Sequence, residues 1–393
     1  MYIVLLDPQR VGHLDVLLPI VLQLRKSNPD LMLDILYIDP DQFQILKKNR
    51  FLNEMVNSVG QAVLLKSPGS KGSLLKKAVV GVKLFCYLLK ILTSRRVIFF
   101  QWKSLDSLAS RMFGSVASIK GKSLTYQPMN NHYIEEMRRY FDEFGSPRDE
   151  RAESLWLRQF SNKINVGDGA LINSVDSLNY FAMMGYSNFH IIGYTHLYPE
   201  YTKYLQANYR SHLSLEIPSE KLDHRVCFGI FVNKFWGKWG GQSDDWFVDR
   251  FCEIIDCLKE LEHDPVILVR GHPTLKTDVI ERAVAKSGYE DIHITYLHPA
   301  IIGIASKAVI GITESTAYHY VMGVGTVYID YGGMRLENYE IFPEGSLNAS
   351  YGTIVAKNRE ELSNVLSDEM LLEAAVENYQ PLIKHKINLS IFE

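Results

Sequence analysis

Two stretches decide the fold class of this 393-residue chain, PVILVRGHP at residues 265–273 and AVIGITEST at residues 308–316. Each begins as a short apolar run, and each run ends in small or hydrogen-bonding residues. Apolar runs without alternation are typical of strands buried on both faces of a parallel sheet. Because ligands bind at the carboxyl ends of such strands, we expect an anion site between Pro265 and Tyr331.

The same alternation of apolar runs and helical patterns extends in both directions from this stretch. In the first half of the chain, strands are predicted at residues 2–6, 31–37, 62–65, 97–100, 170–172 and 190–194. In the second half they are predicted at residues 225–231, 265–269, 293–296, 308–312 and 326–329. The pattern weakens between residues 197 and 224, which predicts a linker there. The chain is therefore predicted to be α/β, with domains at residues 1–210 and 211–393.

Composition restricts the function classes. A formal net charge of −3 disfavours a general nucleic-acid binder. The four cysteines, at positions 86, 227, 252 and 257, have no CxxC spacing, which favours reduced thiols over a disulfide framework or a zinc site. No apolar stretch is long enough to cross a membrane, and the N-terminal residues do not resemble a signal peptide. These features predict a cytoplasmic protein.

Arg270-Gly271-His272-Pro273 is the first motif with chemical potential. A histidine at the carboxyl end of a strand, held by the stiff proline after it, is suited to donate a hydrogen bond to a phosphate oxygen. Arg270 adds positive charge beside it. The alternative is a turn histidine without a ligand. A second dipeptide, His298-Pro299, also follows a predicted strand and competes for the same role.

Two further loops follow predicted strands of the second domain. Glu314, Ser315 and Thr316 place two hydroxyls and a carboxylate where helix capping alone would explain one of them. They are candidates for binding a phosphate and a ribose. Lys234 and Lys238 lie in a glycine-rich segment that would let the backbone approach a phosphate closely. The alternative for this segment is an exposed hairpin with aromatic anchors.

The first domain offers two candidate segments. Asp168 lies between two glycines and precedes a strand, so it is either a turn residue or a general base for an acceptor hydroxyl. Arg10, Gly12 and His13 follow the first strand, where they would line the acceptor side of a cleft. This segment does not match the GxGxxG fingerprint of dinucleotide-binding proteins.

Residues 73–96 form a long amphipathic pattern in which Lys76, Lys83 and Lys90 recur every seven residues. Such lysines share one stripe of a helix. A basic amphipathic helix is able to lie on an anionic membrane surface. The alternative is a helix that covers the sheet and holds its lysines in water.

The ordered set of motifs resembles that of bacterial GT-B glycosyltransferases of the sialyltransferase, Kdo transferase and CDP-glycerol glycerophosphotransferase group. Gly167-Asp168-Gly169 resembles the acidic motif of the first domain, His272-Pro273 the His-Pro motif, and Ser315-Thr316 the Ser/Thr motif beyond it. The first acidic position of the family is a glycine here, and its Ser-Ser pair is Ser-Thr. The resemblance implies a GT-B fold, with two Rossmann-like domains facing each other across a cleft.

By this resemblance Asp168 is the acceptor base, His272 binds the donor phosphate, and Ser315 and Thr316 help to hold a CMP group. The implied function is transfer of a sugar to a glycan in bacterial surface polysaccharide or lipopolysaccharide synthesis, and the first expectation for the donor is CMP-linked sialic acid or Kdo. No DxD carboxylate pair stands out in the sequence, so the transfer is expected to be metal-independent. No cofactor is expected. A UDP-sugar-dependent transferase, a nucleotide-sugar epimerase and a non-catalytic two-domain binding protein remain alternatives, and inversion or retention stays open.

Overall fold

The computed structural model describes residues 1–8, 11–65, 74–102, 105, 107–126, 165–173, 186–222, 225–232, 243–261, 264–272, 275, 277–312, 317–331, 352–383 and 387–392. The chain forms two compact units. Unit 1 comprises Met1–Tyr201 and His385–Glu393, and unit 2 comprises Thr202–Lys384. The units meet within helix α9 (Pro199–Leu213), so the stretch predicted as a linker is largely helical. The boundary proposed from the sequence, after residue 210, falls inside the same helix.

Unit 1 is built on a seven-stranded sheet in the order β3-β2-β1-β4-β5-β6-β7, in which every neighbouring pair is parallel. The strands are β1 (Tyr2–Leu6), β2 (Met32–Tyr37), β3 (Gly60–Leu64), β4 (Val97–Trp102), β5 (Gly121–Tyr126), β6 (Gly169–Ile172) and β7 (Phe189–Ile191). The chain begins at β1 in the middle of the sheet, runs outward to β3, and then returns to β4. This order is that of the doubly wound Rossmann fold.

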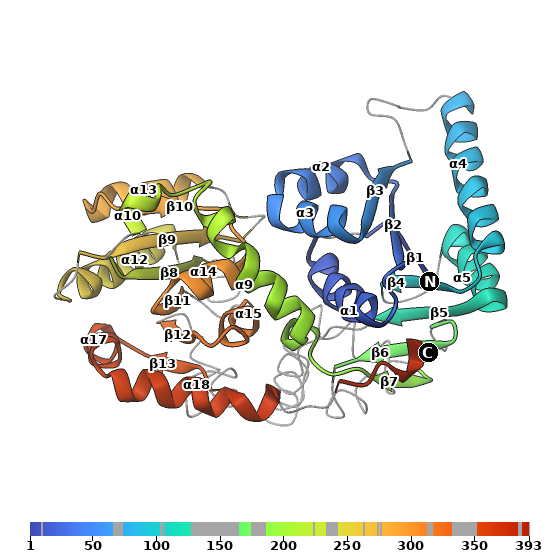
Figure 1. Ribbon diagram of the computed structural model, residues 1–393. Helices are drawn as coiled ribbons and strands as arrows, with labels where there is room; N and C mark the ends of the chain where they lie inside the picture. Colours follow the sequence, from blue (N-terminus) through green and yellow to red (C-terminus); the bar gives the residue numbers. More distant parts are fainter. Residues whose placement is uncertain are drawn as a thin grey trace, which may run out of the picture. The chain divides into compact units, whose positions relative to one another are not determined.

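Helices flank this sheet (Figure 1). They are α1 (Leu14–Ser27), α2 (Pro40–Lys48), α3 (Arg50–Val59), α4 (Leu74–Thr93) and α5 (Leu108–Lys120), with the short 3-10 helices η1 (Val11–His13), η3 (Thr195–Leu197) and η5 (Ser390–Phe392). Apolar residues of α4 and α5 join those of β1 and β4 in one buried cluster, so these two helices cover the same face. Right-handed crossovers place α1 on the opposite face, because β1 to β2 runs in the other direction across the sheet.

A buried polar network ties α4 to this sheet. The Asp34 side chain of β2 is 1% exposed and accepts hydrogen bonds from Tyr2 Oη at 2.6 Å, Gln61 Nε2 at 3.0 Å and Lys90 Nζ at 2.6 Å. Lys83 Nζ donates to the carbonyl of Leu65 at 3.3 Å. Two of the three lysines in the predicted stripe therefore bind acceptors on the sheet side. Lys83 and Lys90 are thus only partly exposed, and each has a partner on the sheet side.

Unit 2 contains a second parallel sheet, in the order β10-β9-β8-β11-β12-β13. The strands are β8 (Cys227–Val232), β9 (Val266–Gly271), β10 (Ile292–Ile294), β11 (Ala308–Ile312), β12 (Val327–Tyr331) and β13 (Ile354–Ala356). Its helices are α10 (Ser219–Leu222), α12 (Asp244–Lys259), α13 (Thr277–Ser287), α14 (Pro299–Ala305), α15 (Tyr318–Met322), α17 (Arg359–Ser367) and α18 (Glu369–Ile383). The strand order repeats that of unit 1, which confirms the predicted α/β class with two Rossmann-like sheets.

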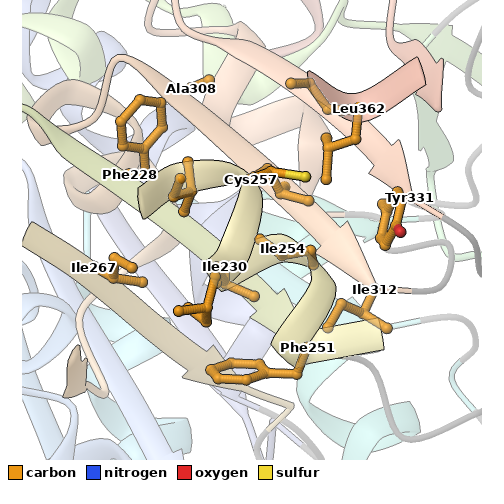
Figure 2. Close-up of a cluster of buried hydrophobic side chains, with 14 of the residues drawn as sticks. Phe228, Ile230, Phe251, Ile254, Cys257, Ile267, Ala308, Ile312, Tyr331 and Leu362 are labelled. Carbon is orange, nitrogen blue, oxygen red and sulfur yellow. The ribbon is translucent and has the colours of Figure 1, made fainter. Parts of the chain in front are cut away.

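The core of unit 2 explains why its strands appear in the sequence as continuous apolar runs. Val266, Ile267, Leu268 and Val269 are all 0% exposed, so β9 is buried on both faces. Figure 2 shows one side of this core, where Phe251 and Ile254 of α12 pack over the strands. Among the described helices of both units, none combines the length and hydropathy that a membrane span requires.

Candidate functional site

The sheet of unit 2 has a switch point between β8 and β11. From this pair the chain builds β9 and β10 on one side and β12 and β13 on the other. Ligands of doubly wound sheets bind outside the carboxyl ends of the strands at such a point. In the register, Val232, Gly271 and Ile312 are neighbours at the ends of β8, β9 and β11. The carboxyl ends of these three strands therefore form one edge, which we call the donor edge.

Most residues predicted to bind the donor follow this edge directly in the chain. The segment with Lys234 and Lys238 begins after Val232, and the segment with Glu314, Ser315 and Thr316 begins after Ile312. These five residues, like Pro273, lie outside the described residues.

His272 lies at the donor edge. Its backbone N–H donates to the carbonyl of Val232 at 2.8 Å, which extends the pairing of β9 with β8 by one residue. Its own carbonyl accepts from Leu275 N at 2.8 Å, so the chain turns here. A Cβ at Gly271 would lie 2.7 Å from Ile280 Cδ1 of α13. Glycine at this position thus lets α13 pack closely against the strand end that carries His272.

Arg270 has a contact that the sequence did not indicate. Its Nε donates to the carbonyl of Leu297 at 2.8 Å, across the edge strand β10. The guanidinium therefore holds the connection between β10 and α14. This contact gives Arg270 a positioning role beside the donor edge, in addition to the positive charge that the sequence places there.

His298, the competing histidine, has a structural role in capping. It is 1% exposed and is the N-cap residue of α14, where its Nδ1 accepts a hydrogen bond from Ala300 N at 3.2 Å. Its ring meets Tyr320 edge-to-face, with the centroids 5.2 Å apart. Pro299 occupies the first turn of the helix, where proline is favoured. These contacts favour half-buried His272 over His298 as a phosphate ligand.

The sheet of unit 1 has its own switch point, between β1 and β4, and aromatic residues follow it. His13 is 6% exposed and stacks on Trp102 at the end of β4, with ring centroids 3.5 Å apart and an interplanar angle of 15°. The rings of Trp102 and of Tyr126, at the end of β5, have centroids 5.7 Å apart. The hydroxyl of Tyr126 donates to Asn173 Oδ1 at 2.5 Å, just beyond β6. We call this row of four residues the aromatic edge.

The aromatic edge agrees with the predicted place of Gly12 and His13, whereas Arg10 lies outside the described residues. The sequence analysis missed Trp102, Tyr126 and Asn173. Burial raises the pKa of Tyr126 above its ordinary value, so this residue is a neutral hydrogen-bonding group at neutral pH. Trp102 is the half-buried ring of this edge, whereas His13 and Tyr126 are buried, and a partly exposed indole suits stacking on a sugar ring.

Asp168 does not lie at this edge. It precedes β6, so it is at the amino end of the strand, roughly 16 Å from Asn173 at about 3.3 Å per residue. Its Oδ2 accepts hydrogen bonds from Ser118 Oγ at 2.7 Å and from Ser123 N at 2.6 Å. Ligands of parallel sheets bind at the opposite end. We therefore assign Asp168 a structural role in joining β5 and β6, and correct its prediction as the acceptor base.

The backbone conformation explains why a glycine precedes Asp168. Gly167 has φ +67°, and a Cβ there would lie 2.6 Å from the carbonyl oxygen of Ser123. An acidic residue would not fit at this position. The departure of Gly167-Asp168-Gly169 from the family motif thus follows from a turn, and the likeness to that motif loses its functional meaning.

His196 in η3 supplies a prediction on stability. Burial lowers the pKa of its imidazole to about 3. In the unfolded chain the group takes up a proton near pH 6.5. The unfolded chain therefore binds this proton at a higher pH than the folded chain does. The free energy of unfolding is unaffected by His196 above pH 6.5 and decreases by about 4 kcal/mol as the pH falls to 3. Denaturant unfolding at pH 8 and pH 4 should show a smaller pH difference for His196→Gln than for the unchanged chain, and equal differences would contradict this.

Comparisons with solved structures support the fold, whereas comparisons of sequence find no relative: no family model and no curated protein matches the chain. The solved structures match over nearly the whole length. A transferase from Siraitia grosvenorii in complex with UDP has a TM-score of 0.52 at 14% identity, and the match covers 100% of this chain and 98% of the other.

Two epimerase structures match in the same way. The UDP-GlcNAc 2-epimerase of Methanocaldococcus jannaschii has a TM-score of 0.52 at 13% identity, with 100% and 95% of the two chains covered. A protein of Listeria monocytogenes assigned as a UDP-N-acetylglucosamine 2-epimerase has a TM-score of 0.55 at 13% identity, with 97% and 92% covered. At such identities the similarity establishes the fold alone. That fold is the GT-B type with two Rossmann-like domains.

Proposed function

We propose that this chain transfers a sugar from a nucleotide-activated donor to a hydroxyl group of a glycan acceptor. The observation that carries the proposal is the donor edge of unit 2. His272 extends β9 there, and the segments with Lys234, Lys238, Ser315 and Thr316 start from the neighbouring strand ends. Cationic and hydrogen-bonding groups at a switch point suit a nucleotide phosphate.

The sequence motifs and the matched structures favour different nucleotides for the donor. The His-Pro and Ser/Thr motifs favour a CMP-linked sialic acid or Kdo, but the acidic member of that motif set has a structural role here. The transferase of Siraitia grosvenorii was solved with UDP, and the epimerases are named for a UDP-sugar. We therefore propose a UDP-linked sugar as the donor. The proposed acceptor is the class that the resemblance implies, a bacterial surface polysaccharide or lipopolysaccharide.

The proposed mechanism needs groups for two events, cleavage of the donor and removal of the acceptor proton. On donor cleavage, negative charge develops on the leaving phosphate, and His272, Lys234 and Lys238 would stabilise it. On the acceptor side a base must remove the hydroxyl proton. With Asp168 structural, we propose His13 for this role, since its imidazole lies at the aromatic edge. His196 is the weaker base, because its low pKa reduces its proton affinity.

The mechanism is proposed to need no metal ion. The carboxylates Asp39 and Asp41 have the spacing of a DxD metal motif, but Asp39 Oδ1 accepts a hydrogen bond from Asp41 N at 2.9 Å and caps α2. Full transfer activity after dialysis against EDTA is the corresponding expectation. Activity restored only by a divalent cation would contradict it.

A panel of nucleotides tests the proposed function. The melting temperature should rise most with UDP, because stabilisation grows with ligand occupancy by about 2.7 kcal/mol at a hundred times the Kd. A larger rise in melting temperature with CMP than with UDP would favour a CMP-linked donor instead. A melting temperature unchanged by UDP, CMP, CDP, UMP and GDP would contradict the proposal as a whole.

Epimerisation of the donor sugar is the second candidate, because two of the matched structures carry that name. An epimerase needs no acceptor. Incubating the protein with a UDP-sugar alone and following the sugar by NMR therefore separates the two functions. A changed configuration without any acceptor would favour the epimerase.

A further inference from the structure

The outer face of α4 has an unusual composition for a surface helix. Its exposed residues between positions 78 and 93 are all uncharged: Ala78, Val79, Gly81, Val82, Phe85, Cys86, Leu89, Leu92 and Thr93. At 100° per residue they occupy one continuous side of the helix. Meanwhile Lys83 and Lys90 bind acceptors on the sheet side. An ordinary sheet-covering helix turns its charges to water, so α4 has the reverse arrangement.

Helix α5 extends this apolar surface. It packs beside α4 on the same face of the sheet, as the shared buried cluster shows and as can be followed in Figure 1. Leu108 is 76% exposed, Met112 48% and Ile119 73%, at the spacing of one helical stripe. On α4, Val82 is 62% and Phe85 59% exposed. Exposed apolar groups in such number on two adjacent helices mark an interaction surface.

The charge of the sequence around α4 and α5 favours an anionic partner. Residues 61–122 contain one acidic residue, Asp106, and twelve basic residues: Lys66, Lys71, Lys76, Lys77, Lys83, Lys90, Arg95, Arg96, Lys103, Arg111, Lys120 and Lys122. This excess of eleven positive charges leaves −14 for the rest of a chain whose total is −3. Arg95, Arg111 and Lys120 are exposed next to the apolar residues.

We propose that the α4–α5 surface docks on a lipid bilayer that contains anionic lipids. Apolar side chains at the centre would enter the acyl boundary, and the cations around them would pair with lipid phosphates. A nucleic acid would use the charge but not the exposed valine, leucine and phenylalanine side chains. The inference does not depend on the proposed function, since it concerns only unit 1 and its surface.

Vesicle sedimentation tests this proposal. The full chain should bind vesicles of equal parts phosphatidylcholine and phosphatidylglycerol, and bind pure phosphatidylcholine much more weakly. The double variant Val82→Ser/Phe85→Ser should bind more than tenfold more weakly, because it removes two exposed apolar side chains that would enter the acyl boundary of the bilayer. Arg95→Glu should bind at least about fivefold more weakly at low salt, an effect that screening by salt reduces. The matched control is Met370→Ser/Leu371→Ser on α18 of unit 2, where both residues are also exposed.

A second measurement uses one further substitution. Cys86 is exposed on the apolar face, Cys252 is half-buried, and Cys227 and Cys257 are buried, so Cys252→Ser leaves Cys86 as the accessible thiol. An environment-sensitive fluorophore on Cys86 should shift to shorter wavelength when anionic vesicles are added. No vesicle binding, or binding equal in the serine double variant with its melting temperature unchanged, would overturn the proposal. Concentration-dependent dimers that the double variant abolishes, without vesicle binding, would instead make this a surface for a second copy.

Discussion

Replacing His272 with alanine is expected to lower kcat/KM for sugar transfer by roughly 10²–10³. The residue extends β9 at the donor edge, next to the end of β8, which pairs in turn with β11. A hydrogen bond from an imidazole to a phosphate oxygen strengthens as the bond to the sugar breaks, so its loss affects the transition state more than the bound donor. Steady-state kinetics with a UDP-sugar, and single-turnover rates, measure this effect.

The chain offers a matched control for this substitution. His293 is also half-buried, but it is the middle residue of edge strand β10. It is in register with Leu268, before the carboxyl end of β9. His293→Ala should change the melting temperature and leave kcat/KM close to that of the unchanged chain. His272→Gln keeps a donor N–H and should recover part of the activity. Near-normal turnover of His272→Ala would remove the residue from the site.

The fold was largely predictable because most strands of both sheets are buried on two faces. Runs such as residues 266–269 are apolar without interruption, and no other element explains them. The elements that were missed have mixed surroundings. β5 begins Gly121-Lys122-Ser123, and α5 exposes Leu108 and Ile119, so neither shows the usual periodicity. In α9, aromatic and charged residues alternate irregularly and hide the helix.

The candidate site was predictable only where the logic of strand ends applied. His272 and His13 each follow a strand, and each lies at a carboxyl edge. Asp168 was misassigned although the sequence correctly places it before a strand, because a residue that precedes a parallel strand lies at the amino end of the sheet, opposite the edge where ligands bind. His272 and His298 could not be separated by sequence, since capping by His298 Nδ1 is visible only in the structure.

The same limit explains the lysines of α4. Their spacing of seven correctly predicts a common stripe, but it does not tell which way the stripe faces. The buried Asp34 carboxylate decides this, because an ionised group inside the sheet needs a cation close to it, and Lys90 Nζ lies 2.6 Å away. Attraction to a buried partner thus orients the helix, and its apolar residues are left outside.

Replacing His13 with phenylalanine is expected to lower kcat by roughly 10²–10⁴ while the melting temperature stays close to that of the unchanged chain. Phenylalanine keeps a ring that stacks on Trp102, but it lacks a nitrogen that accepts the acceptor's proton. A role in packing alone would therefore leave the variant active.

The pH–rate profile distinguishes the two roles further. If His13 is the base, the rate of the unchanged chain falls on the acid side as the imidazole is protonated, and this acid limb disappears in the residual activity of His13→Phe. Trp102→Ala is the complementary variant: it removes the stack and should raise KM for the acceptor or misplace the imidazole, yet it should retain the acid limb. An acid limb that persists unchanged in His13→Phe would assign the base to another residue, while leaving the donor edge and its His272 test unaffected.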